Sequence, residues 1–167
     1  MGFFGKPSDN YGGNTPEENS HNGERFNFNR YFLAERRMAL ENISYELQKM
    51  LRGTSSYKLR VNDTFVSQMI EGKGAKVNFN RLLKFEPDGP FILSVTYSVL
   101  LVFNPGTKDE VDWSKIDIAK EFRENCPELC QNMMLKATML IAQITNEATG
   151  TPFIGGAIAS PRPPIHP

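Results

Sequence analysis

Apolar and polar residues alternate along three stretches in the middle of the chain. Along residues 57–71, 75–85 and 91–103, apolar side chains occupy most of the alternate positions. This period of two is typical of strands that bury one face. The third stretch also carries Leu100 and Val102 on its second face, so we expect that end of it to be buried on both sides.

Short turns join these three stretches. The sequence Gly72-Lys73-Gly74 separates the first two, and residues 86–90, which read Glu-Pro-Asp-Gly-Pro, separate the second from the third. Glycine and proline supply the backbone angles that tight reversals need. The three stretches are therefore predicted to form an antiparallel meander.

Helical periodicity follows the alternating stretches. Residues 112–122 carry apolar side chains three and four positions apart behind Asp112, which is a suitable N-cap. A second helix is predicted over 127–146, because Pro127 suits a first turn and an apolar stripe runs along the segment. The stripe is wider than one sheet face needs, which indicates a second partner, either another subunit or a client. Strands followed by helices indicate an α+β fold.

The segment 32–51 fits two structures. Apolar residues recur in it at helical spacing: Leu33, Leu40, Ile43, Leu47 and Leu51. However, Ile43, Tyr45 and Leu47 also alternate as they would in a strand. Periodicity alone favours the helix here.

The two ends of the chain differ from its middle in composition. Residues 1–30 are rich in Gly, Asn, Ser and Glu and are expected to form a flexible polar arm. From about residue 150 the chain carries five prolines and the pair Gly155-Gly156, which predicts an irregular segment. Residues 31–167 are expected to form a single domain, since the length fits one core and no internal repeat is visible.

Charge and cysteine content exclude several classes of function. Nineteen basic and nineteen acidic residues give a formal net charge of zero, so a broad nucleic-acid surface is not expected. The longest apolar run, 99–103, is far too short for membrane insertion. The first residues lack the apolar stretch of a secretory signal, and two cysteines argue against a disulfide-stapled secreted fold. We therefore expect a cytoplasmic protein.

The side chains that could carry chemistry do not form a recognisable catalytic or metal-binding set. Cys126 and Cys130 have a spacing that could hold a metal, but the only histidines, His21 and His166, lie in the predicted tails. Packing of buried thiols is the simpler interpretation. Four acidic residues near the first predicted helix are expected to stabilise its positive N-terminus: Asp109, Glu110, Asp112 and Asp117. We expect no enzyme activity, cofactor or metal.

Two short motifs and the order of elements resemble the SecB family of export chaperones. The segment 124–129, Glu-Asn-Cys-Pro-Glu-Leu, looks like the start of that family's long helix, and 43–46, Ile-Ser-Tyr-Glu, looks like its first strand. The resemblance covers residues 38–164. It implies four antiparallel strands followed by two helices, with 38–47 as the first strand instead of a helix.

The same resemblance implies a function. SecB-like proteins are ATP-independent holdases of unfolded or precursor polypeptides, assembled as a dimer of dimers that docks on the SecA motor. This chain departs from the family where Cys130-Gln131-Asn132 replaces an aromatic segment, and in its tail, which lacks the usual proline pattern and acidic end. These departures favour a variant of the function, namely a dedicated chaperone of one partner of the toxin–antitoxin type.

Seven apolar residues are candidates for binding clients. Val66 and Ile70 lie on the otherwise polar face of their predicted strand, where exposed apolar side chains often mark binding surfaces. Leu82, Leu100 and Val102 are expected to extend this patch, with contact between subunits as the alternative. Met133 and Met134 could line an adaptable groove, with an ordinary core as the alternative. A scaffold or interaction module of the same fold is the competing function.

Overall fold

The computed structural model describes residues 26–49 and 56–153, and the chain there forms an α+β fold. The elements in chain order are α1 (Phe28–Tyr31), β1 (Arg37–Leu47), β2 (Lys58–Ile70), β3 (Gly74–Glu86), β4 (Phe91–Val102), the 3-10 turn η1 (Trp113–Lys115), α2 (Ile118–Asn125) and α3 (Pro127–Thr149). The predicted order of four strands followed by helices is confirmed.

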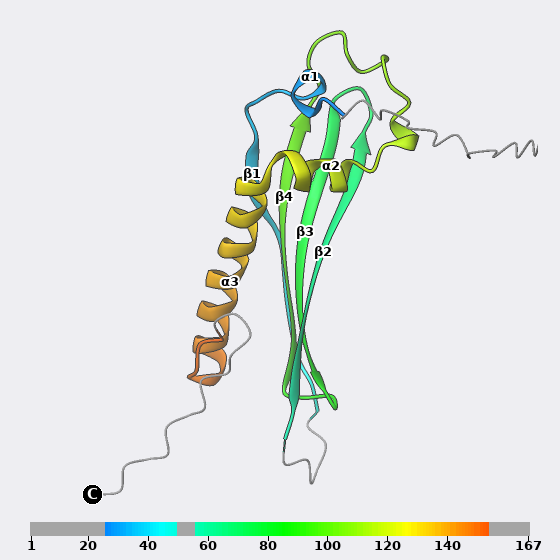
Figure 1. The fold of residues 1–167 in the computed structure, drawn as a ribbon. Coiled ribbons are helices and arrows are strands. Elements are labelled where there is room, and N and C mark those ends of the chain that lie inside the picture. The colour runs from blue at the N-terminus through cyan, green and yellow to red at the C-terminus, as the bar shows by residue number, and fades with distance from the viewer. Residues whose placement is uncertain (1–25, 50–55, 154–167) are drawn as a thin grey trace, which may run out of the picture.

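The four strands form one antiparallel sheet in the spatial order β1-β4-β3-β2. The meander predicted from alternation is confirmed, because β2 pairs with β3 and β3 with β4 along almost their whole lengths. The hairpin turn at Gly72 and Gly74 is also present, and both glycines have positive φ. β1 lies beside β4, so β1 and β2 are the two edges of the sheet (Figure 1).

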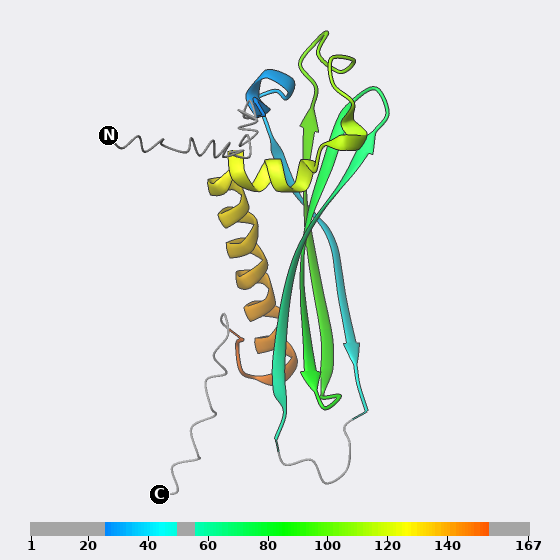
Figure 2. The same ribbon diagram turned by 45° about the vertical axis from the view of Figure 1, so that its right-hand side comes forward.

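The described helices cover only one face of the sheet. α3 runs along β3 and β4, and α2 crosses β2 and β3 near one end of the sheet (Figures 1 and 2). The core fills the space between these layers, and its fully buried members alternate along the strands. They include Val77, Phe79, Leu83, Leu93, Val95 and Val99 from the sheet, and Phe122, Met133, Ala137 and Ile141 from the helices.

A bulge in β1 explains why its sequence fits two structures. Leu40 is paired with Tyr97 and Asn42 with Thr96, so Glu41 is an extra residue with no partner of its own on β4. A bulge shifts the alternation of side chains by one position. Met38 and Leu40 therefore share the helix-covered face with Ile43, Tyr45 and Leu47. The shift by one position gives the apolar residues of this segment a spacing of three or four residues, which suggests a helix. The helix prediction is therefore wrong.

The helix predicted over 112–122 is divided into two pieces. The side chain of Asp112 accepts a hydrogen bond from the Ser114 amide and caps η1, whereas Asp117 accepts from the Lys120 amide and caps α2. Both acids are thus caps, as the simpler interpretation of the acidic cluster predicts. α3 starts at Pro127 as predicted and ends three residues later than expected, at Gly150 in the left-handed conformation. No described helix has the length and apolarity needed to cross a membrane.

The folded part begins earlier than residue 31. Phe28 is buried in the core, and its ring packs 4.9 Å from that of Phe32. Phe26 stacks on Tyr31, and Trp113 meets both rings edge to face. The predicted polar arm therefore extends too far, because these widely spaced aromatic residues give no periodic signal. Residues 1–25 and the C-terminal residues 154–167 lie outside the described part.

Candidate binding surface

The face of the sheet opposite the helices, here named the open face, has a polar centre. The side-chain amide of Asn80 donates to Ser94 Oγ at 2.7 Å and to Thr96 Oγ1 at 2.8 Å. Ser98 donates to a carboxylate oxygen of Glu41 at 3.1 Å. Asn78 Oδ1 lies in the same region, buried and without a hydrogen-bond partner among the described residues. The centre of the open face is therefore polar and has little to offer an apolar partner.

Apolar side chains gather at one corner of the open face. We name this set the apolar corner: Leu33, Val66, Ile70, Leu100 and Val102. Val66 is 54% exposed and Leu100 is 40% exposed. Ile70 and Val102 lie on either side of Gly74 in one row of the sheet. Gly74 itself is buried between them, and Ile70 and Val102 are both half-buried.

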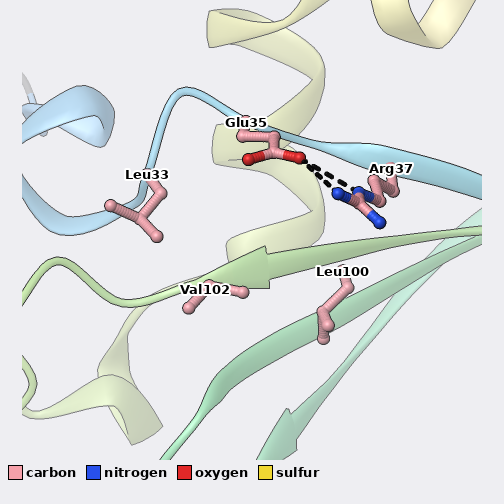
Figure 3. A pocket seen from close by; sticks show the side chains of 5 residues that line it. All are labelled: Leu33, Glu35, Arg37, Leu100 and Val102. Carbon is pink, nitrogen blue, oxygen red and sulfur yellow. Dashed lines mark hydrogen bonds and ion pairs between the residues drawn. The ribbon is translucent and has the colours of Figure 1, made fainter.

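A cleft of about 270 Å³ lies along one side of the apolar corner. Leu33, Leu100 and Val102 line it together with the ion pair between Glu35 and Arg37 (Figure 3). The chain before β1 forms one wall, because the amide of Leu33 donates to Val102 O at 2.8 Å. In the sequence Leu33 belongs to an ambiguous helical pattern. This contact and the bridge between Phe32 and Phe103 bring it to the cleft.

The charges around the apolar corner are paired. Arg37 Nη2 lies 2.8 Å from Glu35 Oε1, and both side chains are well exposed. Lys76 pairs with Glu41, and hydrogen bonds from Lys76 and then Ser98 lower the pKa of that carboxyl below its usual value. The corner therefore has no excess of either sign, and binding there would rest on apolar contact.

Four of the seven predicted residues meet at the apolar corner, and three do not. Leu82 also faces the open side, but its partners are Asn62 and Ser94. It lies eight positions along β3 from Gly74, which is about 26 Å at the usual rise of a strand. Leu82 therefore belongs to a separate place on the same face.

Met133 and Met134 lie on the other side of the sheet. Met133 is fully buried between α3 and the strands, so the prediction that it lines a client surface is wrong. Met134 is half-buried, and its carbonyl oxygen lies 3.4 Å from Arg81 Nη1. Arg81 also binds Thr138 and forms an ion pair with Asp63. The apolar residues that α3 does expose are Leu135 and Met139.

Cys126 and Cys130 are buried free thiols, as expected from the packing interpretation. Arg36 Nη1 donates to Cys126 Sγ at 3.2 Å. Burial raises the pKa of the Cys126 thiol, and burial followed by the neighbouring Cys126 raises the pKa of Cys130 to about 11. Among the described residues, no group of three or more histidine, cysteine or acidic side chains could hold a metal ion.

These raised pKa values predict slow thiol chemistry. At pH 8 a thiol with a pKa of about 11 has a thiolate fraction about a hundredfold smaller than one at 9. We expect Cys130 to react with a disulfide reagent at least about a hundredfold more slowly in the folded protein than in concentrated guanidinium chloride, and Cys126 to be slowed as well. A control cysteine at the exposed position of Ala39 should react quickly. Equal rates at all three positions would contradict the burial.

A second cavity, of about 190 Å³, lies where the end of α3 meets the sheet. Its walls are almost wholly apolar and include Leu59, Phe85, Phe91 and Phe153. The amide of Phe153 donates to Thr145 Oγ1 at 2.8 Å, which turns the chain back along α3. No pattern in the sequence indicates this cavity, because its residues come from β2, β3, β4, α3 and the segment after α3.

Comparison with known proteins assigns no family to the chain. No family model matches it, and no curated protein matches it. A crystallised protein of unknown function from Streptococcus agalactiae is similar in structure, with a TM-score of 0.31 and 13% sequence identity. The similarity covers 75% of this chain and 95% of that protein.

Proposed function

We propose that this protein is an ATP-independent holdase that binds apolar segments of unfolded or precursor polypeptides at the apolar corner. The observation that carries the proposal is the exposure of Val66 and Leu100 on the open face, beside the cleft that Leu33, Leu100 and Val102 line. A solvent-exposed apolar site on a folded chain is typical of protein-binding surfaces. The resemblance to SecB-like chaperones supports the same function.

The geometry of the apolar corner suits an extended and variable ligand. Its apolar residues come from β2, from β4 and from the segment before β1. Apolar side chains of a client could contact Val66 and the cleft separately, without a fixed sequence between them. Balanced charges around the corner fit clients of either sign. A cytoplasmic location, docking on the SecA motor and self-association are further parts of this proposal.

An alternative function, still that of a chaperone, is to bind one dedicated partner. The missing SecB-like docking segment favours this alternative. A scaffold of the same fold is the alternative from another class. A general holdase should protect many denatured proteins. A dedicated chaperone should protect one, and a scaffold should ignore denatured clients and bind one folded partner.

The test is the aggregation of a chemically denatured model protein on dilution, with and without the full chain and in the absence of ATP. We expect suppression near one chaperone assembly per client. The double variant Val66→Glu and Leu100→Glu should need at least about fivefold more protein for the same effect, because a buried charge opposes apolar contact. Both positions are exposed, so the fold should tolerate the change.

The matched control is the double variant Leu135→Glu and Met139→Glu. These residues are 58% and 64% exposed, and they lie on α3 instead of the open face. The control should protect the client as well as the unchanged protein does. If both double variants lost protection of the client equally, clients would bind elsewhere than at the apolar corner. Absence of suppression at a large excess would contradict a general holdase.

A further inference from the structure

The outer side of β2 is a sheet edge that borders the apolar corner. Among residues 26–49 and 56–153 no strand lies beyond β2, which forms the edge opposite β1 (Figure 1). An edge strand presents a row of backbone N–H and C=O groups, and proteins usually block such rows with charges, prolines or bulges. β2 keeps an unbroken register with β3 over all its residues, so it has no bulge.

The two halves of β2 differ in their protection. The half that begins the strand carries Lys58, Arg60 and Asp63. The other half, residues 65–70, contains no charged residue and no proline. We name residues 65–70 the bare edge. It lacks each of the usual features that prevent another strand from pairing with a sheet.

The bare edge directs particular backbone groups outward. The carbonyl oxygen of Lys73, directly before β3, accepts from the Phe103 amide on the side of β4. Since backbone groups alternate along a strand, the odd-numbered residues of β3 bond to β4 and the even-numbered ones to β2. Even-numbered residues of β3 pair with even-numbered residues of β2. The odd-numbered residues of the bare edge therefore turn their N–H and C=O groups away from the sheet: Phe65, Ser67 and Met69. In the part of the chain that the structure describes, none of the backbone hydrogen bonds of turns, loops and caps uses these groups.

An extended polypeptide is the partner that these groups fit. Its backbone can form an added antiparallel strand that bonds to Ser67 and to the odd-numbered residues beside it. Alternate side chains of that strand then lie on the open face beside Val66, which is 54% exposed, and Ile70. The others lie on the helix side beside Met69, which is 40% exposed. An unfolded chain has unpaired backbone groups along its whole length, whereas a folded partner has already paired most of its own.

We propose that the bare edge of β2 holds clients by strand addition, with the client as an added antiparallel strand. This inference rests on the proposed function and deepens it, because it states how a client is bound at the apolar corner. Backbone hydrogen bonds supply affinity that does not depend on the client sequence. Contacts with Val66 and Ile70 add a preference for apolar residues at alternate positions. The partner is therefore an extended, unfolded segment with that alternation.

N-methylated peptides test strand addition on the unchanged full-length protein. The probe is a short fluorescent peptide of alternating valine and serine, and its binding is followed by anisotropy. Only every second amide of an added strand faces β2. Methylation of one alternate set of amides should raise the dissociation constant at least about tenfold, because the methyl groups remove the donors of those hydrogen bonds. Methylation of the other set should change it less than about threefold. Equal effects of the two sets overturn the inference.

A proline in the bare edge tests the same contact from the side of the protein. Ser67→Pro removes an outward N–H group but no hydrogen bond to β3, and Ser67 is exposed. The dissociation constant of the unmethylated peptide should rise at least about tenfold. Val61→Pro is the matched control, because Val61 is also an odd-numbered residue of β2 but lies among its charged residues. The control should bind the peptide as the unchanged protein does. Equal losses in the two variants overturn the inference.

The outcomes separate this inference from the proposed function. If methylation and Ser67→Pro change nothing while Val66→Glu with Leu100→Glu weakens peptide binding, side chains alone hold the client and strand addition is wrong. If the unmethylated peptide does not bind at all, strand addition is also wrong. The proposed function then fails only if the protein does not suppress aggregation of a denatured client either.

Discussion

Replacing Gly74 by alanine is expected to lower the free energy of unfolding by more than about 4 kcal/mol, a loss at the extreme end of single substitutions. Gly74 begins β3 with φ of 150°, and a Cβ at this position would lie 1.8 Å from the carbonyl oxygen of Leu101. Neither strand can move away easily, since Leu101 is fully buried and belongs to a central strand. Urea denaturation followed by the fluorescence of Trp113, the single tryptophan, would measure the loss.

The matched control for this prediction is Gly72→Ala, two residues earlier in the same turn. Gly72 also has a positive φ, of 68°, but nothing lies within 4 Å of the place that the new methyl group would take. Only the backbone strain remains, which costs about 1–2 kcal/mol. Equal losses in the two variants would mean that the close approach of Gly74 to Leu101 does not exist.

The sheet could be predicted from the sequence where the alternation is uninterrupted. The alternation in β2, β3 and β4 keeps its phase from end to end, although Asp63 and Arg81 occupy helix-side positions. Short turns join these strands, so the strands and their pairing follow from local pattern. The same reasoning fails for β1 because Glu41 interrupts the period, and the break is recognisable only from its pairing with β4. The position of β1 beside β4 depends on contacts between distant parts of the chain, and the periodicity of a single segment gives no information about such contacts.

The candidate site could be predicted in part for a related reason. Val66 and Ile70 stand out in the sequence because they are apolar on a face where their neighbours are polar, and strand alternation assigns faces reliably. A helix offers less information, since a wide apolar stripe does not show which of its residues meets the sheet. The prediction for Met133 fails for that reason, and Leu33 escapes prediction because its place at the cleft depends on the irregular segment before β1.

The second large loss of stability is expected at Met133, because its side chain is buried. Met133→Ala should lower the free energy of unfolding by about 2–5 kcal/mol, the usual range for truncating a buried methionine. Met133 is fully buried, whereas Met139 on the same helix is 64% exposed. Met139→Ala should therefore change stability by less than about 0.5 kcal/mol. Urea denaturation of both variants measures the difference.

This comparison also decides between the two roles that a methionine-rich helix can have. A methionine that lines an open groove loses little stability when truncated, because water already reaches it in the folded state. A methionine that fills the core leaves a cavity whose lining loses its contacts. If the two variants were equally stable, α3 would have to separate from the sheet readily, and the gap between them would then be open to clients. A large difference keeps the helix-covered face closed, as the proposal that clients bind at the apolar corner requires.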